Sequence, residues 1–397
     1  MCKEWILDHR TEDVRQLMLS ASRWPDINMR AAVVQISAWQ AARHKLPLWA
    51  ANDDILYPEH ISMEQCSSQA TAQYKGLIIS RLTPQQPLLL TDLTGGFGVD
   101  ATMMARSSED TRLTFVERNE ELCRLARHNL PLLGISHADV ICADSTDTLQ
   151  TIAHQHVIFI DPARRDTHGA RTYAISDCTP DVVTLHNQLL AHADWVVVKL
   201  SPMLDITEAL RQLRQVVEVH AVSLDGECKE LLFVMHATAP DTAAPTIHCV
   251  NIASATGNVQ DFCFTPCDGD SSCPLAATPL RYLYEPNASV MKAAPFAALC
   301  QQFGITKLHP SSHLFTSDTP VADFPGRCFE VIETVNFNKK SLRPLLSSIS
   351  QANITVRNFP LGAPQLRQRL RLRDGGSDYL FATTLADGSH VLVHCKK

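Results

Sequence analysis

Residues 92–101, DLTGGFGVDA, decide how the fold of this 397-residue chain is interpreted. They follow the apolar run Pro87–Leu90 and contain three glycines in four residues, at positions 95, 96 and 98. Glycine lacks the Cβ atom that would keep a ligand away from the backbone. The turn therefore predicts that a small ligand lies close to the chain at this point.

Short apolar segments alternate with helical segments around this turn. This alternation is typical of an α/β fold in which helices cover a parallel sheet. Two further apolar runs, 216–224 and 230–236, fit a hairpin at the end of that sheet. The predicted strands are 87–93, 111–117, 137–142, 156–160 and 194–200, and the predicted helices are 98–107, 119–133, 145–153, 180–192 and 205–214.

Acidic residues follow four successive predicted strands, at Asp92, Glu117, Asp144 and Asp161. Ligands of such sheets bind at the carboxyl ends of the strands. An NAD site is compatible with the pattern G-x-G-x-x-A at 96–101 and with Glu117 at the end of the next strand. The Asp92 carboxylate, however, would repel a pyrophosphate and can accept a hydrogen bond from an ammonium group. Asp144 can accept one from an adenine amino group, so S-adenosylmethionine is favoured. The alternative is that these acids are only helix caps and strand-end residues.

Residues 85–236 resemble a class I S-adenosylmethionine-dependent methyltransferase through four motifs in order: DLTGGFGVDA, FVERN (115–119), ADS (143–145) and IDPAR (160–164). The GGFG turn with ERN is also similar to that of bacterial ribosomal guanine-N2 methyltransferases. The whole chain resembles bacterial methyltransferases that carry a C-terminal THUMP-like domain, through residues 64–75, residues 356–361 and the arginine-rich stretch 367–373.

This resemblance implies a seven-stranded Rossmann-like sheet whose last strand is antiparallel. It also implies that S-adenosylmethionine is the cofactor, with Asp92 and the glycines at its methionine end, Glu117 on the ribose and Asp144 on the adenine. The predicted cofactor contacts are Asp92, Thr94, Gly95, Gly96, Gly98, Asp100, Glu117, Arg118, Asp144 and Asp161.

The segment Asp161-Pro162-Ala163-Arg164 is the predicted catalytic segment, with Asp161, Pro162 and Arg164 as its catalytic residues. An exocyclic base amine is a poor nucleophile, because its lone pair is delocalised into the ring. Hydrogen bonds to Asp161 and to the Pro162 carbonyl would orient that lone pair and stabilise the charge that develops. The resemblance to amino methyltransferases, which use an Asp-Pro or Asn-Pro pair in this way, implies the same role. Their second proline and aromatic residue are replaced here by Ala163 and Arg164, so the platform for stacking a flipped base is missing.

Three cations and one thiol lie in or near this segment. Arg164 and Arg165 can grip a phosphate or a base edge. Lys199, at the end of the fifth strand, is predicted to contact the substrate, or alternatively to pair with a neighbouring acid. Carbon-5 methylation of a pyrimidine would need a nucleophilic cysteine, and the only nearby one, Cys178, is interpreted as a small buried residue.

Four regions are predicted along the chain. Residues 1–80 form a helical region with helices near 11–22 and 30–43, and residues 81–240 form the methyltransferase domain. Residues 241–324 form a middle domain compatible with a ferredoxin-like fold. Residues 325–397 form a THUMP-like domain that is predicted to bind RNA, with a strand at 328–335, helices at 338–351 and 363–369, and a closing hairpin at 379–394.

The charge is unevenly distributed. The net charge of the chain is −7, yet residues 339–397 carry +7. A basic tail on an acidic body predicts a polyanionic partner, here tRNA or rRNA, whereas the alternative is a solvated basic face. Residues 367, 369, 371 and 373 alternate, so an extended strand would place these arginines on one face and a helix would spread them. The predicted RNA-binding residues of the tail are Arg357, Arg367, Arg369, Arg371 and Arg373.

The composition predicts a cytoplasmic protein without a membrane span. No apolar run approaches the roughly 20 residues that cross a bilayer, and the first residues are charged throughout. Thirteen scattered cysteines indicate reduced thiols. Cys263, Cys267 and Cys273 match no zinc or iron–sulfur spacing, so no metal is predicted.

Three functions are compatible with these patterns. The favoured one is methylation of an RNA base at an exocyclic or ring nitrogen. The others are methylation of a small molecule or protein, and RNA binding by an inactive methyltransferase fold, against which Asp92, Gly98, Glu117 and Asp161 argue. The sequence identifies neither the RNA, the nucleotide and the atom, nor the oligomeric state.

Overall fold

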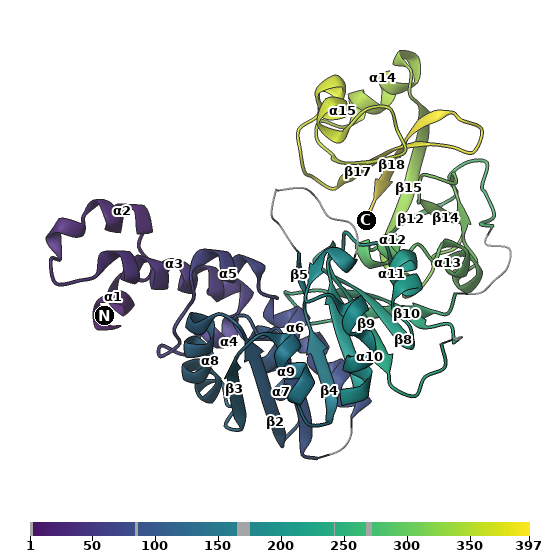
Figure 1. The fold of residues 1–397 in the computed structure, drawn as a ribbon. Helices are drawn as coiled ribbons and strands as arrows, with labels where there is room; N and C mark the ends of the chain where they lie inside the picture. The colour runs from purple at the N-terminus through teal and green to yellow at the C-terminus, as the bar shows by residue number, and fades with distance from the viewer. Residues whose placement is uncertain (1–2, 84–85, 165–174, 242, 267–271) are drawn as a thin grey trace. The chain divides into compact units, whose positions relative to one another are not determined.

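The computed structural model describes residues 3–83, 86–164, 175–241, 243–266 and 272–397, with only the backbone of Arg164. The chain forms two compact units. The first consists of residues 1–224, 229–245 and 252–257, and the second of residues 225–228, 246–251 and 258–397 (Figure 1). None of the described helices is both long and apolar enough to cross a bilayer.

Six α-helices open the first unit. Asp13 caps α2 by accepting from the backbone N–H groups of Arg15 and Gln16. The predicted helix at 11–22 is therefore shorter than expected, and a 3₁₀ turn at Ala21–Arg23 follows it. The predicted helix at 30–43 is confirmed within α3. The helices are α1 (Lys3–His9), α2 (Val14–Leu19), α3 (Met29–Lys45), α4 (Pro47–Ala50), α5 (His60–Gln65) and α6 (Gln69–Leu82).

Helices α3 to α6 share a core with the glycine-rich turn and the helix that follows it. Trp49 and Tyr57 belong to the same buried cluster as Phe97 and Met103, which come from the glycine-rich turn and its helix α7 (Val99–Ala105). At Gly76 in α6, an added Cβ would lie 2.7 Å from the Met103 carbonyl oxygen. The two helix backbones therefore approach closely, which holds the segment before α6 next to the glycine-rich turn.

The sheet of the first unit has the predicted α/β architecture. Strands β1, β2, β3, β4 and β7 are parallel, and β9 pairs antiparallel with β7. Among the strands of this unit, the order is β8-β9-β7-β4-β1-β2-β3, so β9 lies between β7 and β8 and is not an edge strand. The strands are β1 (Leu88–Asp92), β2 (Thr111–Glu117), β3 (Ala138–Cys142), β4 (Gln155–Ile160), β7 (Ala193–Leu200), β8 (Val216–Leu224) and β9 (Glu227–His236); the helices after α7 are α8 (Glu120–Leu132), α9 (Ser145–Thr151), α10 (Val182–His192) and α11 (Ile206–Gln212).

A two-residue strand pair was not predicted from the sequence. β5 (Ala163–Arg164) pairs antiparallel with β6 (Cys178–Thr179), which follows the 3₁₀ turn Ile175–Asp177. Two residues are too few to show any periodicity. This pair brings Ala163, which follows the predicted catalytic Asp161-Pro162 pair, beside Thr179.

The second unit contains one seven-stranded sheet in the order β13-β14-β12-β15-β18-β17-β16. β16 and β17 are parallel to each other, and the other neighbouring strands of this sheet are antiparallel. β12 pairs with β15, so the predicted boundary at 324/325 lies inside this sheet. The elements are β10 (Thr246–Ile252), β11 (Val259–Phe264), β12 (Tyr282–Pro286), α12 (Ala288–Ala293), α13 (Phe296–Phe303), β13 (Thr306–Lys307), β14 (Phe315–Ser317), β15 (Gly326–Asn336), α14 (Lys339–Ser348), β16 (Asn353–Arg357), α15 (Ala363–Leu370), β17 (Asp378–Thr384) and β18 (His390–Lys396).

A buried carboxylate on one strand of this sheet pairs with arginines on two other strands. Glu285 on β12 has only 6% of its side chain exposed and pairs with Arg327 on β15 and with Arg357 on β16. The Arg357 Nη2 to Glu285 Oε1 distance is 2.9 Å. Arg357 is therefore a partner of a buried acid.

Candidate active site

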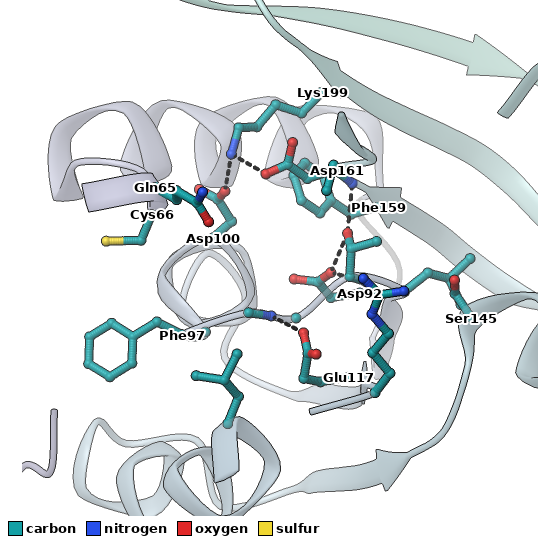
Figure 2. A pocket seen from close by; sticks show the side chains of 18 of the residues that line it. Gln65, Cys66, Asp92, Phe97, Asp100, Glu117, Ser145, Phe159, Asp161 and Lys199 are labelled. Carbon is teal, nitrogen blue, oxygen red and sulfur yellow. Dashed lines mark hydrogen bonds and ion pairs between the residues drawn. The ribbon is translucent and has the colours of Figure 1, made fainter. Parts of the chain in front are cut away.

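The carboxyl ends of β1, β2, β3, β4 and β7 surround a cavity of about 260 Å³ in the first unit (Figure 2). All ten predicted cofactor residues, Asp161 among them, line this cavity together with Lys199. The cavity is lined by Ser62, Gln65, Cys66, Ser67, Asp92, Leu93, Thr94, Gly95, Gly96, Phe97, Gly98, Val99, Asp100, Glu117, Arg118, Leu122, Ala143, Asp144, Ser145, Phe159, Asp161, Ala163, Thr179, Pro180 and Lys199.

The three glycines of the turn are required for different reasons. A Cβ added at Gly95 would lie 2.2 Å from the Phe115 ring, so Gly95 allows close packing on β2 and does not make room for a ligand. Gly96 and Gly98 have φ values of +54° and +84°, in the left-handed region that favours glycine. At Gly96 an added Cβ would meet only the Thr94 carbonyl oxygen, at 3.8 Å. Of the three, Gly96 best matches the prediction that a ligand lies close to the backbone.

Asp92 is a buried acid at the end of β1. It is 1% exposed, and its Oδ1 accepts from the Thr94 backbone N–H at 2.9 Å. Among the described residues, none forms an ion pair with it. Burial raises the pKa of Asp92 to about 8, and the neighbouring Asp100 and Asp161 contribute in the same direction. A buried carboxyl of this kind fits a ligand that brings its own positive charge, because such a charge favours the ionised carboxylate, whereas a pyrophosphate would disfavour it.

The Glu117 carboxylate is fixed at the end of β2. Its Oε2 accepts from the Gly96 N–H at 2.9 Å (Figure 2), and its Oε1 accepts from the Asn119 N–H at 2.8 Å. A carboxylate has about four acceptor positions, so two remain for the hydroxyls of a ribose. Arg118 lines the cavity beside it.

Asp144 is the N-cap of α9. Its Oδ1 accepts from the Thr146 N–H at 2.8 Å and from the Thr146 hydroxyl at 2.5 Å, and these hydrogen bonds lower the pKa of Asp144. The helix-cap role, which the sequence offered as the alternative for this acid, is therefore present in the structure. Asp144 also lines the cavity, so the cap and the predicted adenine contact are compatible.

Asp161 is held at both its backbone and its side chain. Its N–H donates to the Thr94 hydroxyl at 2.7 Å, and its Oδ2 accepts from Lys199 Nζ at 2.5 Å (Figure 2). Among the described residues, no donor contacts Oδ1. Pro162 is buried behind it. The Arg164 side chain and the whole of Arg165 lie outside the described residues.

Lys199 forms ion pairs with neighbouring acids, as the alternative interpretation of the sequence expected. Besides Asp161, its Nζ donates to Asp100 Oδ2 at 3.2 Å and to the Ser67 hydroxyl at 3.1 Å. Burial lowers the pKa of Lys199, but the Asp100 and Asp161 carboxylates outweigh it and raise that pKa well above its ordinary value. The Asp100 carboxylate, predicted to contact the cofactor, contacts two lysines, Lys75 and Lys199.

Two groups of residues that line the cavity were not predicted from the sequence. Gln65 ends α5, and Cys66 and Ser67 lie between α5 and α6; all three belong to the segment through which the chain resembles the family. Their only local signal is Ser68, which caps α6 by accepting from the Thr71 N–H. Thr179 and Pro180 reach the cavity because β6 pairs with β5, which no sequence pattern indicated.

The predicted row of tail arginines is not extended. Leu366 and Leu370 are four residues apart and both buried, which is helical spacing, and α15 carries Arg367 and Arg369. Arg371 has φ +57° and ends the helix. Of the two conformations that the sequence left open, the structure therefore has the helical one at Arg367 and Arg369, so the four arginines do not line one face of an extended strand.

The contacts of these arginines differ. Arg367 pairs with Asp374 at 2.5 Å, and the Arg369 guanidinium lies 4.9 Å from the centre of the Phe337 ring. Arg369, Arg371 and Arg373 are exposed, as are Lys339, Lys340 and Arg343 on α14. Of the cysteine trio, Cys267 lies outside the described residues.

The comparison with a solved structure of nearly the same length decides the family. The crystal structure of the "putative methyltransferase from Porphyromonas gingivalis W83" is 35% identical, with a TM-score of 0.88, and the match covers 100% of this chain and 97% of that chain. The chain is a class I S-adenosylmethionine-dependent methyltransferase with a C-terminal THUMP-like domain. A THUMP domain-like family matches residues 326–397, and a ferredoxin-like domain family matches residues 282–325.

Other comparisons add little to this assignment. An S-adenosylmethionine-dependent methyltransferase from Agrobacterium tumefaciens is 16% identical, with coverage of 49% of this chain and 60% of that chain and a TM-score of 0.32. A "putative rRNA-methylase" from Clostridium thermocellum is 13% identical, with coverage of 42% and 96% and a TM-score of 0.32. Values this low carry no argument about function. No curated protein matches the chain.

The methyltransferase uses S-adenosylmethionine, and the cavity fits that cofactor. Asp92 is a buried acid that no described cation pairs with, and the cofactor carries an ammonium group. Glu117 keeps acceptor positions for two ribose hydroxyls, and a Cβ added at Gly96 would meet only the Thr94 carbonyl oxygen within 4 Å. The roles of the individual residues stay predictions.

Proposed function

We propose that this methyltransferase modifies a nitrogen atom on a base of tRNA or rRNA. The observation that carries the proposal is the set of exposed cations on two helices of the second unit. α14 and α15 bury their leucines in one cluster with β17 and β18, through Leu342, Leu345, Leu366 and Leu370. Their charged side chains and the residues after α15 are left exposed: Lys339, Lys340, Arg343, Arg369, Arg371 and Arg373.

This basic face, defined by those six residues, suits a phosphate backbone. A protein that neutralises phosphates releases counterions, which gives affinity without sequence information. The rest of the chain, residues 1–338, carries −14, so nucleic acid is attracted to this face and repelled elsewhere. Arg357 and Arg367 pair with Glu285 and Asp374, so their predicted RNA contacts are weaker candidates than the exposed six.

The chemistry of transfer would depend on Asp161. The bound cofactor supplies an electrophilic methyl group on a sulfonium. Asp161 Oδ1 is available to accept an N–H from the attacking amine, while Lys199 holds Oδ2. An acceptor fixed in this way orients the lone pair and stabilises the positive charge that develops on nitrogen. Pro162 fixes the chain at the turn, so that its carbonyl can act as a second acceptor.

The test compares RNA from cells with and without the gene. Nucleosides from separated tRNA and rRNA fractions are examined by mass spectrometry, and the purified protein is then incubated with the RNA of the deletion strain and labelled S-adenosylmethionine. We expect one methylated nucleoside to disappear in the deletion and to be restored in vitro. Unchanged nucleosides in both fractions, with methylation of a protein or a small molecule instead, would overturn the RNA assignment.

A further inference from the structure

A buried lysine that the site chemistry does not use lies beneath the cavity. The side chain of Lys75, on α6, is 0% exposed. Its Nζ lies 2.5 Å from Glu230 Oε1 on β9 and 3.1 Å from Asp100 Oδ1 on α7. Burying a charge is costly unless it is paired, and both of these partners of Lys75 are acids. One of them, Asp100, also belongs to the active site.

Asp100 links this buried pair to the active site. Its Oδ1 faces Lys75, whereas its Oδ2 accepts from Lys199 Nζ at 3.2 Å and from the Ser67 hydroxyl at 2.8 Å. Burial alone would raise the pKa of Asp100, but Lys199 and Lys75 outweigh it and lower that pKa to about 2. Asp100 therefore stays ionised and is shared between the two lysines.

The contacts form a chain of alternating charges that ends at the catalytic carboxylate. We call Glu230–Lys75–Asp100–Lys199–Asp161 the charge chain; its outer end is drawn in Figure 2. Its members come from β9, α6, α7, β7 and the segment after β4. Ser67 touches Lys75, Asp100 and Lys199, at 3.4, 2.8 and 3.1 Å. The segment between α5 and α6 is thereby tied to the same chain.

We propose that Lys75 and Glu230 are positioning residues that hold Asp100, and through it Lys199, where Lys199 orients Asp161 toward the methyl acceptor. Lys199 is shared between Asp100 and Asp161. Without Lys75, Lys199 would be the one cation among the described residues that pairs with Asp100, and it would shift toward Asp100 and away from Asp161. Asp161 would then lose the ion pair that fixes Oδ2. This inference rests on the proposed role of Asp161 and adds residues that touch neither the cofactor nor the substrate.

The test uses the full chain with Lys75→Met, Glu230→Gln and the double variant. The single variants leave a buried charge without its partner and are expected to lose stability. The double variant removes both charges of the pair and is expected to recover the melting temperature, because a neutral pair has no unpaired charge. Arg81→Met is the matched control, since Arg81 lies on the same helix and pairs with Glu218, outside the charge chain.

We expect the double variant to keep the melting temperature of the wild type but to transfer methyl groups at least tenfold more slowly. The substrate is total RNA from the deletion strain with labelled S-adenosylmethionine. The KM for this RNA and the dissociation constant of S-adenosylhomocysteine should both stay within about threefold of the wild-type values, because no binding group is removed. Arg81→Met should show the wild-type kcat. A double variant with the wild-type kcat would overturn the proposal, since Lys75 and Glu230 would then contribute only stability.

A crystal structure of the double variant separates this inference from the proposed function. If wild-type protein does not methylate RNA, the proposed function fails while the positioning role is still measured. We expect the ion pair between Lys199 Nζ and Asp161 Oδ2 to be broken in the double variant and kept in Arg81→Met. An unchanged ion pair in the double variant would overturn the positioning role whatever the substrate is.

Discussion

At the scale of single residues, Asp92 links the cofactor to pH. With a pKa of about 8, Asp92 is protonated in the free protein at neutral pH. A bound ammonium favours the carboxylate, so cofactor binding at pH 7 should release a proton. Affinity for S-adenosylhomocysteine should rise from pH 6 to pH 8, by at most about tenfold per pH unit. Calorimetry in two buffers with different ionisation enthalpies measures the released proton, and Asp92→Asn should abolish the release and lose about 1–3 kcal/mol of binding.

The same residue predicts a pH effect on stability. The raised pKa means that Asp92 contributes stability below its unfolded value of 3.8, and that this contribution is lost as the pH rises through about 8. Asp92→Asn should therefore raise the melting temperature relative to wild type more at pH 8.5 than at pH 5. An equal difference at both pH values would show that Asp92 is not protonated in the free protein.

Asp161 should affect turnover and leave cofactor binding nearly intact. Asp161→Ala removes the acceptor for the substrate amine, and we expect methyl transfer to slow by about 10²-fold or more. S-adenosylhomocysteine affinity should stay within a few-fold, because Thr94 and Asp92 keep their hydrogen bond. Asp161→Asn distinguishes charge from shape, since it keeps an acceptor oxygen but loses the ion pair with Lys199. Wild-type turnover in both variants would show that Asp161 only shapes the turn and takes no part in catalysis.

At the scale of elements, the turn between β1 and α7 depends on one close approach. An Ala at Gly95 would place its Cβ 2.2 Å from the Phe115 ring, and overpacking of this kind costs about 1–3 kcal/mol of unfolding free energy. Gly95→Ala should be destabilised by that amount, as measured by urea denaturation. Combining it with Phe115→Leu should recover part of the loss, because the ring is the obstacle. Additive losses in the double variant would contradict this account.

The sheet around this turn shows which features could be predicted from the sequence and which could not. Alternation of apolar and helical segments predicted all five parallel strands, because each is a short segment rich in apolar residues that stands between helical segments. The acids predicted at the strand ends line one cavity, because the carboxyl ends of parallel strands meet at the same edge of the sheet. The sequence left open that Lys199 pairs with a neighbouring acid, but it did not show that Asp100 is shared between Lys199 and Lys75, since no local pattern relates side chains from α6, α7 and β7. The position of Thr179 at the cavity wall could not be predicted either, because it depends on the pairing of two strands that have only two residues each.

At the scale of the whole molecule, the basic face should govern the salt dependence of RNA affinity. Replacing Arg369, Arg371 and Arg373 by Gln should weaken binding and flatten the slope of log K against log salt by about 0.7–0.9 for each phosphate that is no longer neutralised. The matched control replaces three exposed arginines of the first unit, Arg30, Arg124 and Arg211, by Gln, which changes the net charge equally. Equal slopes for the two triple variants would remove the basic face from RNA binding.

Charge substitution is a sounder test than truncation for this protein. Removing residues 326–397 would remove β15, β16, β17 and β18 from the seven-stranded sheet and leave β12 without its β15 partner. A loss of RNA affinity after truncation would therefore reflect unfolding as well as the removal of RNA-binding side chains. The triple variant keeps the buried leucines of α15 and changes only exposed side chains.

The Glu285 ion pairs have a consequence for how such chains arise by gene rearrangement. Glu285 belongs to the segment that matches a ferredoxin-like domain, whereas Arg327 and Arg357 belong to the THUMP-like segment. A recombination event at 325/326 would separate this buried carboxylate from both arginines in one product, which is strongly destabilising. The two segments carry separate family descriptions, yet they can be exchanged between genes only together.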